Sequence, residues 1–205
     1  MGRRAMAFLA AVVGIGATST AAAQYEAATT WAHCFSGDAR FCAEAGEHYA
    51  EGTGGADRNV AMAAQAWNQG CEAGDAGSCA RLGSLHEVGV ALAGIPRSLS
   101  AAARLYERAC RAHDAFGCHR LARLLWQGRG VRRNVRRAAR LDGEACDRGS
   151  GDACVALAAA YATGRGVARD PDRQAALLRR ACLMGHSGAC LGSIASDVLQ
   201  LVRGD

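Results

Sequence analysis

The chain has 205 residues, a formal net charge of +5 and a hydrophobic fraction of 50%, which is the composition of an ordinary folded protein. Only 5% of its residues are aromatic, and all 24 of its basic residues are arginine. Because serine β-lactamases of the usual kind need a lysine beside the reactive serine, a chain without lysine is excluded from that class.

Residues 1–23 predict a secretory signal. Arg3 and Arg4 precede the apolar run AMAFLAAVVGIGA, and small residues offer a cleavage site after Ala23. The run is too short for a confident membrane span, and no comparable run follows. The paired arginines leave a twin-arginine route open, although the residues after them fit that pattern poorly. We therefore expect an exported protein, periplasmic or extracellular, without a membrane span.

The cysteines reveal internal repeats. All ten fall into pairs eight residues apart, and the first members of successive pairs are 37, 39, 36 and 36 residues apart. The pairs are Cys34 and Cys42, Cys71 and Cys79, Cys110 and Cys118, Cys146 and Cys154, and Cys182 and Cys190. A fixed period of this length is typical of a repeat array. An even number of cysteines in an exported chain predicts disulfides.

Each repeat predicts a helix, a loop and a second helix. After a partial N-terminal helix at 24–33, the predicted solenoid covers 34–205, with units at 34–70, 71–109, 110–145 and 146–181 and a partial unit at 182–205. In CEAGDAGSC, Gly74 and Asp75 favour the end of one helix and the N-cap of the next. The second helices are expected to follow good N-cap residues, namely Asn59, Ser98, Asn134 and Asp170.

Geometry favours a disulfide within each pair. Eight residues of continuous helix would separate two α-carbons by about 12 Å, whereas a disulfide needs roughly 4.4 to 6.8 Å. The glycine and the N-cap supply the turn that brings the cysteines together. Local pairing is also the only connectivity that repeats identically along the chain.

The repeat resembles a known family. Its pattern is cysteine, seven residues, cysteine, then L-[GA]-x-x-[YL], then G-x-G-V and an alanine-rich helix. This pattern is similar to the Sel-1-like repeat, a relative of the tetratricopeptide repeat, and the cysteine placement resembles the secreted Helicobacter cysteine-rich branch. The resemblance implies an all-α, disulfide-stapled α/α solenoid that binds proteins, with the first helix of each unit on the concave side. Asp142 stands where the first two units have a bulky residue, Trp67 or Tyr106. This difference predicts that the second helix of the third unit packs more loosely.

The concave side gives the first candidate binding surface. The positions two and five residues after the second cysteine of a unit vary in chemistry, as a recognition surface on a fixed scaffold would. The candidate partner-binding residues are Glu44, Glu47, Arg81, Ser84, Arg120 and Arg123, followed by Ala156 and Ala159 in the fourth unit. Ordinary solvated positions would vary too, so both interpretations stay open.

The arginine-rich segment RGVRRNVRRAAR gives a second candidate binding surface. Arg132, Arg136 and Arg140 lie four residues apart on one flank of a predicted helix. They could receive an acidic partner, an anionic glycan or a lipid headgroup, or they could form a solvated outer face. Export disfavours nucleic acid as a partner.

Catalysis and metal binding have weaker support. The cysteine-rich branch implies penicillin binding or β-lactam hydrolysis as an alternative function, but the chain has neither lysine nor a G-x-S-x-G motif. Cysteines separated by seven residues do not match zinc sites, and His33 and His119 beside them are expected to be ordinary helix-face residues. We therefore expect an exported protein-interaction module with no catalytic residue, cofactor or metal.

Overall fold

The computed structural model describes residues 26–191, which are almost entirely helical. The predicted signal at 1–23 and the end of the last partial unit lie outside the described residues. The helices are α2 (Glu26–Phe35), η1 (Ala39–Phe41), α3 (Cys42–Glu51), α4 (Val60–Glu72), α5 (Ala76–Val88), η2 (Ala91–Ala93), α6 (Leu99–Arg111), α7 (Ala115–Gln127), α8 (Val135–Asp147), α9 (Gly151–Thr163) and α10 (Pro171–Leu183). The fold class is confirmed: the chain is an all-α solenoid.

The helices begin where polar caps satisfy their first backbone N–H groups. The side chain of Asn59 accepts hydrogen bonds from the backbone N–H groups of Ala61 and Met62. Ser98, Asn134 and Asp170 cap α6, α8 and α10 in the same way. A cap of this kind is worth about 1 kcal/mol.

A disulfide joins the end of each second helix to the start of the next unit. The α-carbons of all five pairs lie 4.5 to 4.7 Å apart. The turn between them needs a left-handed residue, which is Gly74 in the second unit, with a φ of 96°. In the third unit this residue is His113, with a φ of 66°, which is the single non-glycine residue with positive φ among residues 26–191.

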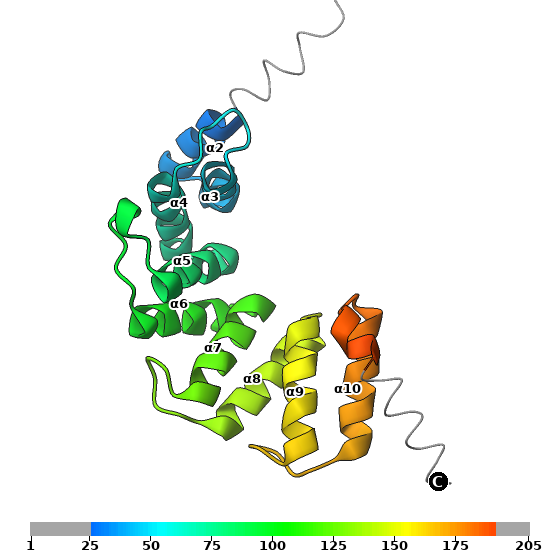
Figure 1. The fold of residues 1–205 in the computed structure, drawn as a ribbon. Coiled ribbons are helices and arrows are strands. Elements are labelled where there is room, and N and C mark those ends of the chain that lie inside the picture. The colour runs from blue at the N-terminus through cyan, green and yellow to red at the C-terminus, as the bar shows by residue number, and fades with distance from the viewer. Residues whose placement is uncertain (1–25, 192–205) are drawn as a thin grey trace, which may run out of the picture.

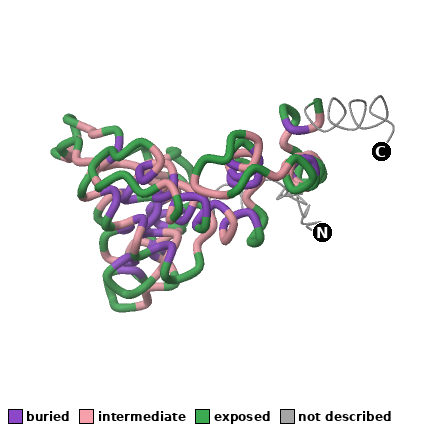
Figure 2. Tube along the Cα trace, turned by 90° about the horizontal axis from the view of Figure 1, so that it is seen from below, coloured by how far each residue is buried: buried purple, intermediate pink, exposed green. Residues whose placement is uncertain are grey.

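The helix pairs stack into an arc (Figure 1). The first helices α3 and α5 lie toward its inner, right-hand side, and the second helices α4 and α6 lie toward its outer, left-hand side. Helix α5 contacts both α3 and α7, so the first helices of the first three units pack against one another. The buried residues lie in the middle of the stack, and the exposed residues concentrate at the turns (Figure 2).

The core is built from alanines, from leucines of the first helices and, in the first two units, from one aromatic side chain of the second helix. Trp67 packs on Gly46, and fully buried Tyr106 packs on Gly83. A methyl group at Gly83 would lie 2.8 Å from the Tyr106 ring, so the aromatic side chain requires the glycine.

The third unit has a different pair at these two positions: an acid replaces the aromatic residue, and a larger residue replaces the glycine. Ala122 stands at the glycine position and Asp142 at the aromatic position. The expectation of a looser helix is wrong, because α8 is as long as α6, at 13 residues, and Asp142 is fully buried. The reason is hydrogen bonding: His119 Nδ1 lies 2.8 Å from Asp142 Oδ1, and Trp126 Nε1 donates to Oδ2 at 2.6 Å.

Candidate functional site

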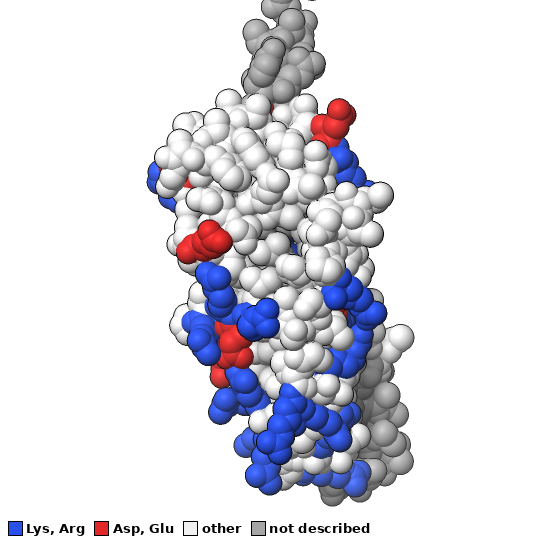
Figure 3. All heavy atoms as spheres, turned by 90° about the vertical axis from the view of Figure 1, so that its left-hand side faces the viewer, with Lys and Arg blue, Asp and Glu red and all other residues white. Residues whose placement is uncertain are grey.

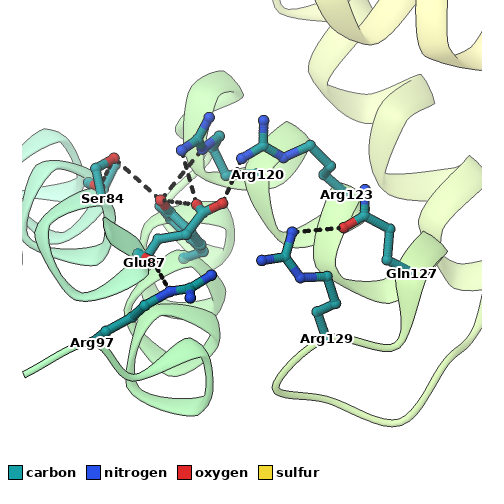
Figure 4. Close-up of polar contacts among 9 residues, drawn as sticks. Ser84, Glu87, Arg97, Arg120, Arg123, Gln127 and Arg129 are labelled. Atoms are coloured by element: carbon teal, nitrogen blue, oxygen red, sulfur yellow. Dashed lines mark hydrogen bonds and ion pairs between the residues drawn. The ribbon is translucent and has the colours of Figure 1, made fainter. Parts of the chain in front are cut away.

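A polar network lies between α5 and α7 and is centred on Glu87. Its carboxylate accepts hydrogen bonds from Tyr106 Oη (2.8 Å), Arg120 Nη2 (2.8 Å) and Arg123 Nη2 (2.5 Å). Figure 4 shows both guanidinium groups directed toward Glu87 from α7. The Glu87 side chain is only 10% exposed, whereas that of Arg123 is 40% exposed. One buried acid therefore fixes a basic side chain at the surface.

The environment keeps this acid charged. Burial raises the pKa of Glu87, but the hydrogen bond from Tyr106 and the charges of Arg120 and Arg123 together lower that pKa below its ordinary value. Burial also raises the pKa of Tyr106, so its hydroxyl group keeps its proton. Because two guanidinium groups face one carboxylate, the network carries an excess positive charge.

The structure brings only some of the predicted concave residues together. Ser84, Arg120 and Arg123 join the Glu87 network, since Ser84 Oγ lies 3.1 Å from Tyr106 Oη. Glu47 and Arg81 instead form their own ion pair between α3 and α5. Glu44 is separate from both groups, and its carboxylate lies 3.8 Å from His48 Nε2.

The next inter-unit boundary, between α7 and α9, has different chemistry at the same repeat position. Glu87 and Trp126 each stand eight residues after the second cysteine of their unit. The Arg165 guanidinium lies 5.1 Å from the centre of the Trp126 ring. A pocket of about 520 Å³ opens beside them, lined by Trp126, Ala156, Ala159, Ala160, Thr163 and Arg165. The alanines predicted for the concave face therefore line a hollow.

Sequence reasoning missed the residues that connect the units. It named neither Glu87 nor Trp126 as a site residue, although their shared position in the repeat was a usable signal. His119, expected as an ordinary helix-face residue, pairs with Asp142. His33 stacks on Phe41 with ring centres 4.8 Å apart.

The outer face carries a basic groove of about 1070 Å³ between α6, α8 and the loop before α8. Figure 3, which views this side, shows arginines gathered over its lower part. Six arginines line the groove, namely Arg104, Arg108, Arg111, Arg132, Arg133 and Arg137. Glu107 also lines it and accepts hydrogen bonds from Arg137 at 2.5 Å.

Only Arg132 of the predicted arginine trio lines this groove. Arg136 and Arg140 are exposed outside it, and Arg140 lies 3.9 Å from Glu144. The prediction that these three arginines share one flank of a helix is wrong for Arg132, which lies in the loop before α8. The groove combines this loop and α8 with α6. The α6 arginines could not be assigned to the groove before the packing of the two helices was known.

In the part of the chain that the structure describes, two groups of side chains bring possible metal-ligand atoms within 4.8 Å of one another. One contains Cys110 and Cys118, whose thiolates are consumed by their disulfide. The other contains Glu26, Glu44 and His48, and both of its carboxylates belong to exposed residues. Neither group offers the buried, preformed ligand set of a structural zinc site.

Within residues 26–191, no helix has the length and apolar character needed to cross a membrane.

The Sel1 repeat family model matches the chain four times, at residues 39–75, 76–114, 115–150 and 151–186. Each match begins five residues after the first cysteine of a predicted unit, close to the start of its first helix. A comparison with curated protein sequences finds no match.

Solved structures share the fold. The protective antigen c5321 of uropathogenic Escherichia coli, which displays an SLR fold, has a TM-score of 0.72 and 22% identity over 80% of this chain and 34% of its own. A Sel1 repeat protein from Oxalobacter formigenes has a TM-score of 0.73 and 21% identity over 82% of this chain and 66% of its own. The Helicobacter pylori cysteine-rich protein B has a TM-score of 0.47 and 21% identity over 62% of this chain and 94% of its own. This chain thus spans about a third of the first protein and two thirds of the second.

The family and the architecture agree. Four matched repeats cover most of the chain, and each corresponds to a helix pair of the arc. The chain belongs to the Sel1 repeat family, and its stacked helix pairs form a scaffold of the protein-interaction type.

Proposed function

We propose that the protein is an exported scaffold that binds a partner protein along the inner face of its arc. One observation carries this proposal: buried Glu87 pairs with the largely buried Arg120 and holds Arg123 at the surface, so that the group has a net positive charge. Arginine groups fixed in this way recognise carboxylates at a lower entropic cost than mobile side chains do. An acidic segment of a partner is the ligand that this surface suits.

The interaction is tested by capture on immobilised, oxidised full-length protein. The double variant Arg120→Ala, Arg123→Ala removes the basic groups of the network, and Arg136→Ala, Arg140→Ala is the matched control on the outer face. We expect envelope or medium fractions to yield a protein that binds the wild type and the control but not the first variant. Equal capture by all three proteins would refute the proposal, provided that thermal melts show all three folded.

Export is supported by the disulfides. Five pairs within 34–190 suit an oxidising compartment, and residues 1–23 have the composition of a secretory signal. Non-reducing peptide mapping of protein recovered from cell fractions tests both points. Five local disulfides in the periplasm or medium are expected, whereas free thiols in a cytoplasmic fraction would contradict export.

The β-lactam alternative gains no support from the inner face. The Ser84 hydroxyl lies beside the Tyr106 hydroxyl, in a network whose only acid is bound to arginines. We expect no nitrocefin turnover by the oxidised protein above that of a reduced, unfolded sample. Turnover above that level would restore the alternative.

A second candidate function rests on the outer groove. Six arginines around one recess suit a ligand with several negative charges. Retention on a dextran sulfate matrix tests it, and binding through surface charges should weaken as salt rises. The triple variant Arg104→Ala, Arg132→Ala, Arg133→Ala should elute earlier than Arg136→Ala, Arg140→Ala, and salt-insensitive or identical elution would remove this candidate.

A further inference from the structure

The pocket between α7 and α9 is open because two arginines of the preceding boundary are replaced by alanines. At the α5–α7 boundary, Glu87 meets the residues two and five positions after the next second cysteine, Arg120 and Arg123. At the α7–α9 boundary, the corresponding residues beside Trp126 are Ala156 and Ala159. Alanine side chains end at Cβ, so the space that guanidinium groups fill at one boundary is empty at the other.

The aromatic wall of this pocket is held in place from behind. Trp126 Nε1 donates to Asp142 at 2.6 Å, and Asp142 is fully buried and also paired with His119. On the pocket side, Arg165 donates to the Trp126 carbonyl oxygen at 2.8 Å and places its guanidinium 5.1 Å from the ring centre. A wall fixed in this way loses little conformational entropy when a ligand binds.

The lining chemistry selects the ligand. The indole and the methyl groups of Ala156, Ala159 and Ala160 favour an apolar side chain, and an aromatic ring can also stack or pack edge-on against the indole. Arg165 supplies positive charge at the pocket itself, and Arg123, which is paired with Glu87 and does not line the pocket, supplies it at the adjoining boundary. Arg165 is an exposed residue at the pocket, and Arg123 precedes Trp126 by three residues on α7, which places the two on neighbouring parts of the helix surface.

We propose that this pocket accepts an aromatic or large aliphatic side chain of the partner polypeptide, from a residue flanked by carboxylates. The inference rests on the proposed function, because it names the residue class that the inner face recognises. The carboxylates contact Arg165 and Arg123, and the apolar side chain fills the space between Trp126 and the methyl groups of Ala156 and Ala159.

The indole N–H signals provide a direct readout. The chain contains three tryptophans, so a ¹⁵N-labelled sample gives three resolvable indole signals, assigned by single Trp→Phe variants. The probes are N-acetylated tripeptide amides with the sequences Glu-Phe-Glu, Gln-Phe-Gln and Glu-Ala-Glu. We expect Glu-Phe-Glu to shift the Trp126 signal with saturation and the other two to bind at least about fivefold more weakly, because each lacks one of the two recognised groups.

Filling the pocket should abolish this response. Ala159→Arg restores the residue type found at the preceding boundary, and Ala168→Arg makes the same change at an exposed site outside the pocket. We expect Ala159→Arg to weaken Glu-Phe-Glu binding at least about tenfold and Ala168→Arg to leave it within about twofold. No shift of Trp126 in the wild type, or equal affinity in Ala159→Arg, would overturn the inference.

The two proposals fail in different ways. A partner captured by Ala159→Arg but not by the Arg120→Ala, Arg123→Ala variant would preserve the proposed function and remove the pocket as a specificity site. A partner that both variants still capture would remove the proposed function itself. A partner that both variants lose would support the inference.

Discussion

The α5–α7 and α7–α9 boundaries use the same pair of groups with their positions exchanged. In the second unit the acid, Glu87, is on the first helix and its aromatic donor, Tyr106, is on the second. In the third unit the aromatic donor, Trp126, is on the first helix and the acid, Asp142, is on the second. Each unit keeps a buried acid–aromatic hydrogen bond, but the surface left on the inner face is charged in one case and an apolar hollow in the other.

The difference shows how a repeat protein varies its surface without changing its scaffold. Where the acid faces the next unit, it recruits Arg120 and Arg123, and the boundary is closed by ion pairs. Where the indole faces the next unit, alanines follow and the boundary stays open. Four sets of substitutions at these two boundaries test the comparison, and their expected losses of stability decrease in the order given below.

Removing the buried acid of the third unit should have the largest effect. Asp142→Ala leaves His119 Nδ1 and Trp126 Nε1 without their acceptor in the core, and we expect a loss of about 3 kcal/mol in the free energy of unfolding. Urea denaturation measures it. Asp142→Asn keeps the shape and one acceptor oxygen and should cost less, and an Asp142→Ala protein as stable as the wild type would refute this account of the third unit.

Opening the disulfide at the start of α7 should have the next largest effect, because α7 contributes side chains to both boundaries. Closing a nine-residue loop is worth about 2.5 kcal/mol on the chain-entropy estimate. We therefore expect Cys110→Ala, Cys118→Ala to lose about that amount in urea denaturation, and to broaden the indole signal of Trp126. A double variant with unchanged stability would show that the helix caps alone hold this turn.

Neutralising Glu87 should have a smaller and pH-dependent effect. Glu87→Gln should cost about 1.5 kcal/mol at neutral pH, since the arginines lose a charged acceptor but can still reach water. The folded-state pKa of Glu87 lies below its ordinary value of 4.5, so its contribution is complete above that value and disappears as the pH falls through the lowered pKa. The difference in stability between wild type and Glu87→Gln should therefore shrink below about pH 4.5, and a difference that grows on acidification would contradict the pKa direction.

Removing one hydroxyl group should have the smallest effect. Tyr106→Phe keeps the ring on Gly83 and removes the hydrogen bond to Glu87, so we expect a loss of about 1 kcal/mol in urea denaturation. The variant should also reduce partner capture less than Arg123→Ala does, because Tyr106 is fully buried and acts through Glu87. A larger loss of capture for Tyr106→Phe would indicate that the network, rather than the arginine charge, sets recognition.

The local features of the chain could be predicted because they depend on residues close in sequence. Gly74 and Asp75 end one helix and start the next, and the same turn brings Cys71 to Cys79. The repeat spacing then gives the helix pairs and the solenoid. The prediction for Asp142 failed because its partners, His119 and Trp126, come from another helix.

The amino-acid sequence by itself determined the repeat, the caps, the turns and the family. The tertiary structure decided which side chains meet between helices: Glu87 with Arg123, 36 residues later, and the α6 arginines with those beside α8 in one groove. The physical reason is that caps and turns act over a few residues, whereas contacts between units depend on how far each helix pair rotates on its neighbour. The stacking of units places Glu87 beside Arg120 and Arg123, and it places Trp126 beside Ala156 and Ala159, whose short side chains leave a pocket.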